Sequence, residues 1–367
     1  MSCACPPRRD FLQTVAAAAG VAIAAGSSAA AAAKPEEHAG HALASPAGRA
    51  AAIDTHAHLW PTEYLDELER LGDKSTAIAR NMRATDSEAD LAHRLANMDA
   101  AGVRTQLLSP TPQVPQMGDP ADAAKVARMI NDVYAGLIRK YPGRFLAYGA
   151  VPLPHVDEAI REARRSITEL GFKGVAINTL TATRISVADP AFLPFYEEMN
   201  RLGAIVYIHP TGCAANSSMM KDFRLEWVVG APIEDSLAAL HLLKADIPHK
   251  FPNIRFHVAH LGGALAFMMQ RIEDNFTDWK AFPRSPWAEL RKFWFDTANF
   301  HVPALLCMDQ TFSSDRLLLG SDFPYFQDEK YTRAVSYVQK SGLSPDKVRA
   351  ILSGNAAKLL GLGAKHG

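Results

Sequence analysis

The feature that most constrains the fold is an alternation of two kinds of segment, which runs from residue 51 almost to the C-terminus. A short apolar or β-branched run is followed by a loop and then by a longer stretch with helical periodicity. The eight strand candidates are AAIDTHAH, VRTQLLSP, FLAYGAVPL, GFKGVAINT, AIVYIHP, IRFHVAH, KFWFDTA and RLLLGSD. Eight such units in about 300 residues predict an α/β fold, a (β/α)8 TIM barrel, which takes about 250 residues plus insertions.

A doubly wound open sheet is the alternative architecture. It would require a glycine-rich phosphate-binding turn, with the spacing G-x-G-x-x-G, after an early strand. The segment AHLGGALAF contains Gly262 and Gly263 side by side and lacks that spacing. The sequence therefore favours the barrel, which we assign to residues 51–362.

The first 50 residues stand outside the repeating pattern. Paired Arg8 and Arg9 precede a mildly apolar, alanine-rich stretch that ends in small residues near Ala30–Ala33. This arrangement resembles a twin-arginine signal peptide, which we assign to residues 1–33, followed by a flexible linker over 34–50. We therefore expect the twin-arginine export machinery to be a partner and the mature protein to be periplasmic or otherwise exported.

Charge and hydrophobicity exclude two other classes of partner. Lysine and arginine together number 39, as do aspartate and glutamate, so the formal net charge is zero. A nucleic-acid-binding protein would usually carry a basic face, so we expect no nucleic-acid partner. After the N-terminal segment no apolar run approaches the roughly 20 residues needed to span a membrane, so we expect no membrane association of the mature protein.

Ionisable side chains recur at the C-terminal ends of the predicted strands, which is where TIM barrels carry their chemistry. They are His56 and His58 on the first strand, His209 on the fifth, His260 on the sixth and Asp322 on the eighth. Asp296 ends the seventh strand, and it can either line the site or cap a neighbouring helix. Thirteen histidines scattered over a surface would not produce this coincidence.

The alternation of side chains along a strand assigns these residues to faces. It predicts that Asp54, His56 and His58 share one face of the first strand. In IRFHVAH it places His260 on the inward face and leaves His257 on the opposite face, toward the helix layer.

The residue types at these positions suit a metal site. Neutral imidazole binds zinc and other late first-row ions, and one carboxylate completes a site that keeps room for water or substrate. We expect one divalent ion per chain, zinc or alternatively manganese, bound by His56, His58, His209 and Asp322. His260 is then free to act as an acid, a base or a substrate-orienting group, and Asp322 can serve as a second catalytic residue.

The ligand motifs resemble those of the metal-dependent amidohydrolase superfamily from about residue 53 to 360. The H-x-H of the first strand is followed in order by IHP, AHLGG and GSDFP. VPLPHVDEAIREARRSITELGFKGVAIN is similar to the aminocarboxymuconate-semialdehyde decarboxylase branch, which includes resorcylate and methylsalicylate decarboxylases and some lactonases. Binuclear amidohydrolases bridge two metals with a lysine or glutamate at the end of the fourth strand. Asn178 ends that strand here, so the resemblance implies a single metal.

Two reactions remain open at this stage. The first is non-oxidative decarboxylation, a carbon–carbon lyase reaction, of an aromatic or dienoic carboxylic acid. The second is hydrolysis of a lactone, an amide or a related ester. Both would use the same five residues, so the ligand set does not separate them, and the resemblance to the decarboxylase branch favours the first.

The loops that follow the strands must supply the substrate contacts. The candidates are Trp60 and Arg83 after the first strand, Arg224 and Trp227 after the fifth, and Phe323, with Tyr325 nearby, after the eighth. Aromatic rings combined with arginines suit a small planar carboxylic acid, because a guanidinium grips a carboxylate while rings stack on the body. Alternatively, these insertions pack against each other or against a second subunit, and we expect a homodimer.

Overall fold

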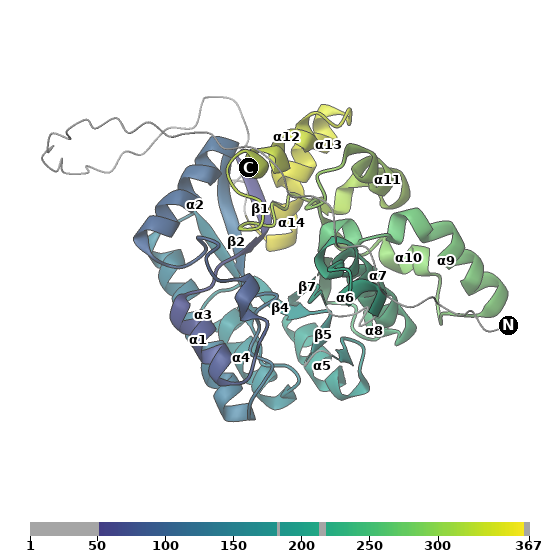
Figure 1. Ribbon diagram of the computed structural model, residues 1–367. Coiled ribbons are helices and arrows are strands. Elements are labelled where there is room, and N and C mark those ends of the chain that lie inside the picture. The colour runs from purple at the N-terminus through teal and green to yellow at the C-terminus, as the bar shows by residue number, and fades with distance from the viewer. Residues whose placement is uncertain (1–50, 182–183, 213–217, 363–367) are drawn as a thin grey trace, which may run out of the picture. The chain divides into compact units, whose positions relative to one another are not determined.

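The structure is a computed structural model that describes residues 51–181, 184–212 and 218–362. Eight parallel strands pair in chain order around a barrel (Figure 1). They are β1 (Ala52–His58), β2 (Val103–Ser109), β3 (Phe145–Ala150), β4 (Gly174–Asn178), β7 (Ile205–His209), β8 (Arg255–Val258), β9 (Trp294–Asp296) and β10 (Leu317–Leu318). Two short antiparallel strands, β5 (Leu180–Thr181) and β6 (Ile185–Ser186), follow β4.

Backbone hydrogen bonds between β1 and the segment after β10 close the barrel. Thr55 N donates to Leu319 O (2.8 Å), His58 N donates to Phe323 O (2.7 Å), and Asp322 N donates to His56 O (2.9 Å). The last bond joins the two chain segments that carry the first and last predicted ligands. The predicted (β/α)8 barrel is confirmed.

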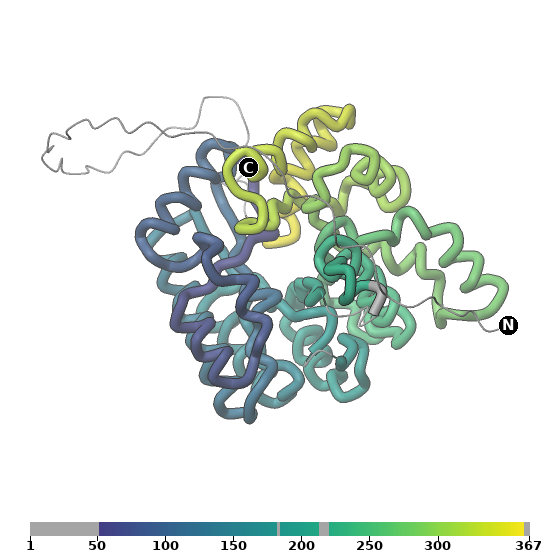
Figure 2. The backbone as a smooth tube through the Cα atoms, in the orientation of Figure 1, coloured from purple at the N-terminus to yellow at the C-terminus, as the bar shows by residue number. Residues whose placement is uncertain are grey.

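Helices connect the strands and cover the outside of the barrel, as the tube in Figure 2 also shows. Up to β7 they are α1 (Thr62–Arg70), α2 (Glu88–Ala101), α3 (Pro120–Lys140), α4 (Val156–Thr168) and α5 (Leu193–Leu202). After β7 they are α6 (Ser218–Lys221), α7 (Ala231–Lys244), α8 (Ile247–Lys250), α9 (Leu265–Trp279), α10 (Pro286–Leu290), α11 (Val302–Phe312), α12 (Glu329–Gln339), α13 (Pro345–Arg349) and α14 (Asn355–Leu360).

The sequence signals for helix ends have a direct structural counterpart in α2. The Ser87 hydroxyl caps the first turn by accepting a hydrogen bond from Asp90 N. Gly102 ends the helix in the left-handed region, with φ of 72°, a conformation that glycine adopts without the steric cost of a Cβ atom. The chain can therefore reverse directly into β2.

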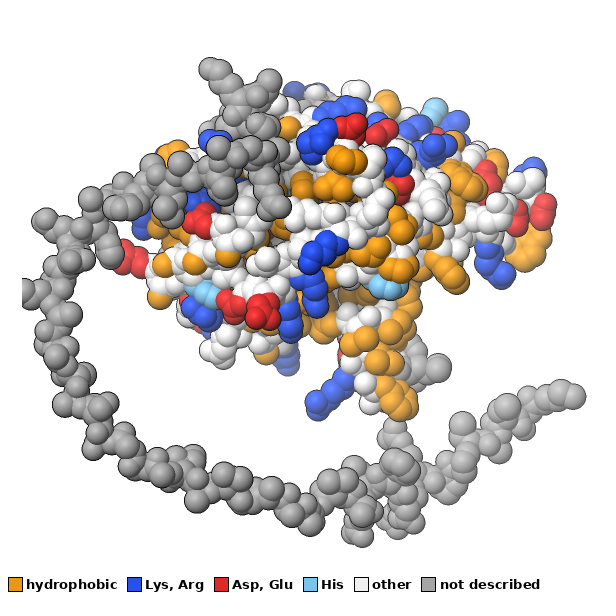
Figure 3. Space-filling model, turned by 90° about the horizontal axis from the view of Figure 1, so that it is seen from above, with side chains coloured by type: hydrophobic (Ala, Val, Ile, Leu, Met, Phe, Trp, Pro, Cys, Tyr) orange, Lys and Arg blue, Asp and Glu red, His pale blue; other side chains and the backbone are white. Residues whose placement is uncertain are grey.

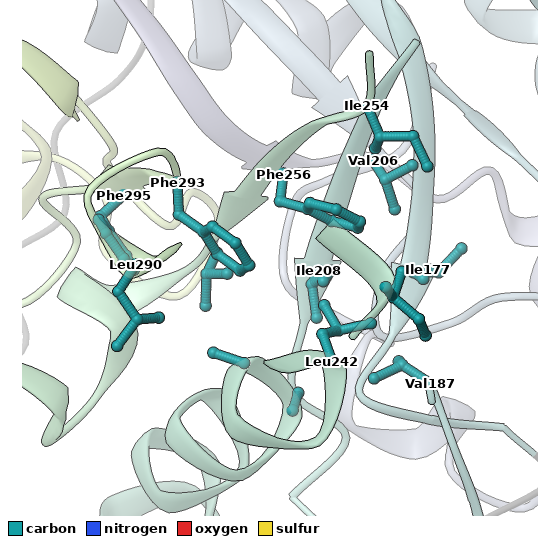
Figure 4. Close-up of a cluster of buried hydrophobic side chains, with 14 of the residues drawn as sticks. Ile177, Val187, Val206, Ile208, Leu242, Ile254, Phe256, Leu290, Phe293 and Phe295 are labelled. Carbon is teal, nitrogen blue, oxygen red and sulfur yellow. The ribbon is translucent and has the colours of Figure 1, made fainter. Parts of the chain in front are cut away.

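The hydrophobic core has two layers, one inside the barrel and one between the strands and the helices. The inner layer contains Ile53, Tyr148, Ile205, Tyr207 and Leu318. In the outer layer, Ile208 of β7 packs beside Leu242 of α7, as Figure 4 shows. Because side chains alternate along a strand, this separation fixes which residues can reach the mouth of the barrel.

The layers correct the predicted orientation of the sixth barrel strand. Phe256 and Val258 of β8 belong to the outer layer, and His257 points inward, where its Nδ1 lies 3.1 Å from the Tyr148 hydroxyl. The prediction that His257 faces the helices was therefore wrong. The strand ends at Val258, and His260 and Leu261 then adopt positive φ values of 52° and 56°. This turn, rather than strand alternation, brings His260 to the barrel mouth.

The pairing of β1 is also irregular. Its register with β2 shifts between Asp54 and Ala57, so Asp54 does not share a face with the two histidines as predicted. Instead, the Asp54 carboxylate accepts hydrogen bonds from the Ser321 and Tyr331 hydroxyls, and Tyr331 lies on α12.

The predicted signal peptide and linker lie outside the described residues. Within the part of the chain that the structure describes, no helix combines the length and the apolar character needed to cross a membrane.

Candidate metal centre

Four side chains converge at the C-terminal mouth of the barrel, and they are the four predicted ligands. His56 and His58 come from β1, His209 from the end of β7, and Asp322 from the segment after β10. One ligand atom from each lies within 4.8 Å of those from the other three, and all four residues are buried.

The spacing of the ligand atoms fits a single small cation. His56 Nε2 and His58 Nε2 lie 3.2 Å apart, and Asp322 Oδ1 lies 3.2 Å from each of them. Metal–nitrogen bonds of about 2.0–2.1 Å at tetrahedral or octahedral angles place neighbouring ligand atoms roughly 3 Å apart. The site therefore fits one divalent metal ion per chain.

His209 supplies a buried nitrogen that needs a partner. Its Nδ1 lies 2.8 Å from Pro210 O, and because a carbonyl oxygen only accepts, Nδ1 must carry the proton. Nε2 then presents a lone pair to the other ligands and has no hydrogen-bond partner among the described residues. Burial lowers the pKa of His209 well below its usual value and lowers the pKa of His58 to about 4, so both rings are neutral, the form that binds metals.

Asp296 lies directly behind His56, which answers the question that the sequence left open. Its Oδ2 is 3.0 Å from His56 Nδ1 and 3.2 Å from His257 Nε2. Its Oδ1 accepts hydrogen bonds from the backbone N–H groups of His260 and Ala298, each at 3.1 Å. A carboxylate in this position fixes the orientation of a ligating imidazole. Although burial favours the protonated acid, His56 and His257 hold the pKa of Asp296 well below its usual value.

His260 stands between two carboxylates. Its Nδ1 is 2.9 Å from Asp235 Oδ2, and its Nε2 is 3.6 Å from Asp322 Oδ2. Burial disfavours the imidazolium, but Asp235 and Asp322 together raise the pKa of His260 well above its usual value. His260 can therefore hold a proton beside the ligand cluster, as an acid must.

A buried polar network supports the backbone of β1 from the helix side. Arg94 of α2 donates to His58 O (2.6 Å) and to Gln106 Oε1 (2.7 Å). Gln106 donates to Asp54 Oδ2 (2.9 Å), which also accepts from the Ser321 hydroxyl (2.6 Å). The network thus links β1, β2 and the segment after β10 beneath the ligands.

Sequence reasoning missed both Asp235 and Arg94, although each left a signal. Asp235 shares a helical stripe with Ala238 and Leu242, and Arg94 shares one with Leu91 and Met98. A charged residue inside an otherwise apolar stripe must find a buried partner. The pattern indicates that a partner exists without saying which residue it is.

A cavity with a volume of about 450 Å³ opens onto the ligand cluster. It reaches His209, His260 and Asp322, and aromatic or apolar side chains form most of its wall. The other lining residues are Ile78, Met82, Trp227, Val228, Ala231, Pro232, Ala298, Asn299, Phe300, Tyr325 and Phe326. None of these lining residues is a lysine or an arginine.

The structure places the predicted substrate contacts in different surroundings. Trp227 lines the cavity. Trp60 is buried and stacks on His58, with ring centroids 5.4 Å apart, so it lies behind a ligand. Phe323 is wholly buried beneath Arg94 and is not among the residues that line the cavity.

The two predicted arginine contacts lie outside the cavity wall in the conformation described. Arg83 is exposed and lines a separate depression with Arg80 and Asp90. Arg224 is exposed and is not part of the cavity wall. Both lie on insertions that fold over the barrel surface, and sequence alone gives no direction for a side chain on such an insertion.

A parallel eight-stranded barrel with three histidines and one aspartate at its mouth defines a metal-dependent enzyme of the amidohydrolase type. The chain matches the amidohydrolase family over residues 53–362 and belongs to that family.

The similar proteins include characterised decarboxylases. The 2-amino-3-carboxymuconate-6-semialdehyde decarboxylase of Dictyostelium discoideum is 29% identical over 335 residues, which cover 86% of this chain and 92% of that protein. The gamma-resorcylate decarboxylase of Rhizobium sp. (strain MTP-10005) is 31% identical over 250 residues, covering 63% of this chain and 76% of the relative. A crystal structure of 2,6-dihydroxybenzoate decarboxylase complexed with 2,6-dihydroxybenzoate superposes with a TM-score of 0.76 at 25% identity, covering 86% and 100% of the two chains.

Proposed function

We propose that the protein is a metal-dependent, non-oxidative decarboxylase of a small aromatic carboxylic acid. The observation that carries this proposal is the position of His260, whose Nε2 lies 3.6 Å from Asp322 Oδ2, beside an ion-binding cluster at the end of an aromatic-walled cavity. The names of the relatives support the same class of reaction.

Different parts of the cavity bind the ring and the carboxylate of a flat anionic substrate. Trp227, Phe300 and Tyr325 offer ring surfaces to the body of the substrate. Since no lysine or arginine belongs to the described cavity wall, the carboxylate is matched at the ligand end. His56, His58, His209 and Asp322 would hold a divalent ion at that end, and its positive charge would attract and orient the carboxylate.

His260 performs the proton transfer. Its Nε2 faces the cavity and delivers a proton to the ring carbon that carries the carboxylate. Protonation interrupts the conjugation of the ring, and breaking the bond to the carboxylate returns the electron pair to the ring and releases CO2. The product has hydrogen in place of the carboxylate, and His260 regains a proton from solvent. A positioned acid of this kind contributes roughly 10²–10⁴ in rate.

Isotope labelling tests this proposal against hydrolysis. The protein is incubated in heavy water with 2,6-dihydroxybenzoate and with salicylate-type acids, and products are analysed by mass spectrometry. A decarboxylase gives stoichiometric CO2 and one deuterium on the carbon that carried the carboxylate. A panel of lactones and amides in ¹⁸O-labelled water is the matched control. Oxygen incorporation there, with no CO2 from any acid, would assign the protein to the hydrolases instead.

For the identity of the metal, we propose zinc, with manganese as the alternative, on the chemistry of the donors. Three imidazoles and one carboxylate suit zinc and are also compatible with manganese. Elemental mass spectrometry of the purified protein should find about one equivalent per chain. Two equivalents that are both needed for activity would contradict a single-metal site.

We also propose that the twin-arginine machinery exports the chain, on the strength of Arg8, Arg9 and the following alanine-rich stretch. Replacing Arg8 and Arg9 with lysine should leave unprocessed protein in the cytoplasm. Normal periplasmic accumulation of that variant would refute the proposal.

A homodimer remains our proposal for the assembly. Phe223, Val228, Phe267 and Trp279 are at least two-thirds exposed, with fractions of 70%, 69%, 87% and 77%. Figure 3 shows apolar side chains gathered in several places on one face of the molecule. Exposed apolar side chains that gather into a contiguous patch are characteristic of interfaces. Light scattering coupled to gel filtration should give twice the chain mass, and a monomer at micromolar concentration would contradict it.

A further inference from the structure

A second buried carboxylate lies behind His260 and outside the ligand set. Asp235 of α7 is fully buried, and its Oδ2 lies 2.9 Å from His260 Nδ1. It does not line the cavity and does not belong to the group of metal ligands. Burying a charged carboxylate costs free energy unless a hydrogen-bonding or oppositely charged partner compensates for it, and His260 is that partner here.

The contact determines which nitrogen of His260 faces the cavity. A carboxylate at Nδ1 accepts the proton of that nitrogen, so the ring is held with Nε2 pointing the opposite way. Nε2 is the atom that lies 3.6 Å from Asp322 Oδ2, at the wall of the cavity. Without this partner the ring could rotate and turn Nε2 away from the cavity, and a ring protonated on both nitrogens would lose the carboxylate that stabilises its charge.

The helix that carries Asp235 is fixed firmly to the His260 turn. The Ser236 hydroxyl lies 3.0 Å from Gly262 O, to which it donates, and accepts a hydrogen bond from Ala264 N at 2.8 Å. A Cβ atom on Gly263 would lie 1.8 Å from Pro232 O, so only glycine permits this approach. Asp235 is therefore held in place by contacts that are independent of its own side chain.

We propose that Asp235 is the positioning residue of His260, which fixes the ring so that Nε2 carries the transferred proton into the cavity. The proposal rests on the proposed function insofar as it assigns that proton to the reaction. Asp235 touches neither substrate nor metal, and it acts only through the imidazole.

Kinetics of matched variants test the proposal. In zinc-loaded protein, Asp235→Ala should lower kcat by about 10–100-fold, the usual effect of removing such a partner, with little change in KM or metal content. Asp235→Asn should be intermediate, because its amide oxygen still accepts from Nδ1. Ser236→Ala, which alters the same turn without touching the ring, is the control and should retain kcat more fully than Asp235→Ala.

A double-mutant cycle separates positioning from a merely structural role. If Asp235 acts through His260, Asp235→Ala should cost nothing further in the His260→Ala background. An equal loss of kcat in both backgrounds would overturn the proposal. Loss of metal from Asp235→Ala would also overturn it, because the carboxylate would then support the ligands instead.

A spectroscopic readout keeps this test independent of the reaction. In ¹⁵N-histidine-labelled, zinc-loaded protein, the His260 signals are assigned by their absence in His260→Ala. Nδ1 should be protonated in the wild-type protein and in Ser236→Ala, and its chemical shift should move toward that of an unprotonated nitrogen in Asp235→Ala. An unchanged spectrum would refute positioning. A changed spectrum without release of CO2 from any acid would retain positioning and refute the decarboxylase.

Discussion

Asp296→Asn is the substitution whose outcome follows most directly from the structure. The side chain is completely buried and changes hardly at all in volume. Four nitrogen atoms surround it: His56 Nδ1 and His257 Nε2 near Oδ2, and the backbone nitrogens of His260 and Ala298 at Oδ1. His56 Nδ1 carries a proton whenever its Nε2 faces a metal ion, so a carboxylate suits this environment and an amide does not.

The expected loss of stability follows from the number of hydrogen-bond donors that lose their acceptor. An asparagine has one acceptor oxygen, so its NH2 group must face either the two rings or the two backbone N–H groups. Each buried donor left without a partner costs about 1–3 kcal/mol, so with two such donors we expect the free energy of unfolding to fall by about 2–6 kcal/mol. Loss of the carboxylate behind a ligating histidine should also weaken metal binding about 10–100-fold, which corresponds to about 1.4–2.8 kcal/mol.

Two assays separate these effects. Competition with a fluorescent chelator measures metal affinity, and urea unfolding in excess chelator measures the stability of the metal-free chain. Asp73→Asn is the control, because this carboxylate is also buried but accepts its hydrogen bonds from Ser75. The control should lose stability and keep its metal affinity. Unchanged metal affinity in a folded Asp296→Asn protein would refute the claim that Asp296 orients His56.

Further substitutions test other parts of the structure. His260→Ala should keep its metal and lose most activity, whereas His209→Ala should lose both metal and activity. Elemental analysis measures the metal content and CO2 release measures the activity. A site that is empty in His260→Ala alone would contradict the assignment of the ligands. Gly263→Ala should cost about 2–4 kcal/mol in urea unfolding, because its Cβ would overlap Pro232 O at a φ of 65°; a stable variant would show that α7 can move. The Arg201 hydrogen bond lowers the pKa of Glu198 from 4.5 to about 2, against burial and with help from Arg164. The ionised Glu198 and its arginine partners should therefore stabilise the fold above about pH 4.5. This contribution to the free energy of unfolding is about 1 kcal/mol once the exposure of both arginines is taken into account, and it should be lost as the pH falls toward 2. Glu198→Gln should therefore lower the melting temperature near pH 6 and leave it unchanged near pH 2, and an equal loss at both values would contradict the linkage.

The sequence by itself determined the class of fold and the ligands. Eight strand-and-helix units leave few architectures, and parallel strands bring their C-terminal ends to one mouth whatever the details of packing. His56, His58, His209 and Asp322 could therefore be grouped without knowledge of a single distance. Residue type then indicated a metal, because imidazole and carboxylate are the donors that such ions prefer.

Only the tertiary structure decided the positions that depend on irregular backbone or on contacts between distant segments. His260 reaches the site through a left-handed turn, and Asp54 leaves the face of its neighbours through a register shift. Simple alternation fails at both places because it assumes an unbroken strand. Asp235 and His260 lie on different elements, and the periodicity of each element reveals which face is buried without naming what it is buried against. The supporting contacts of the site therefore appear only when the helices are docked on the barrel.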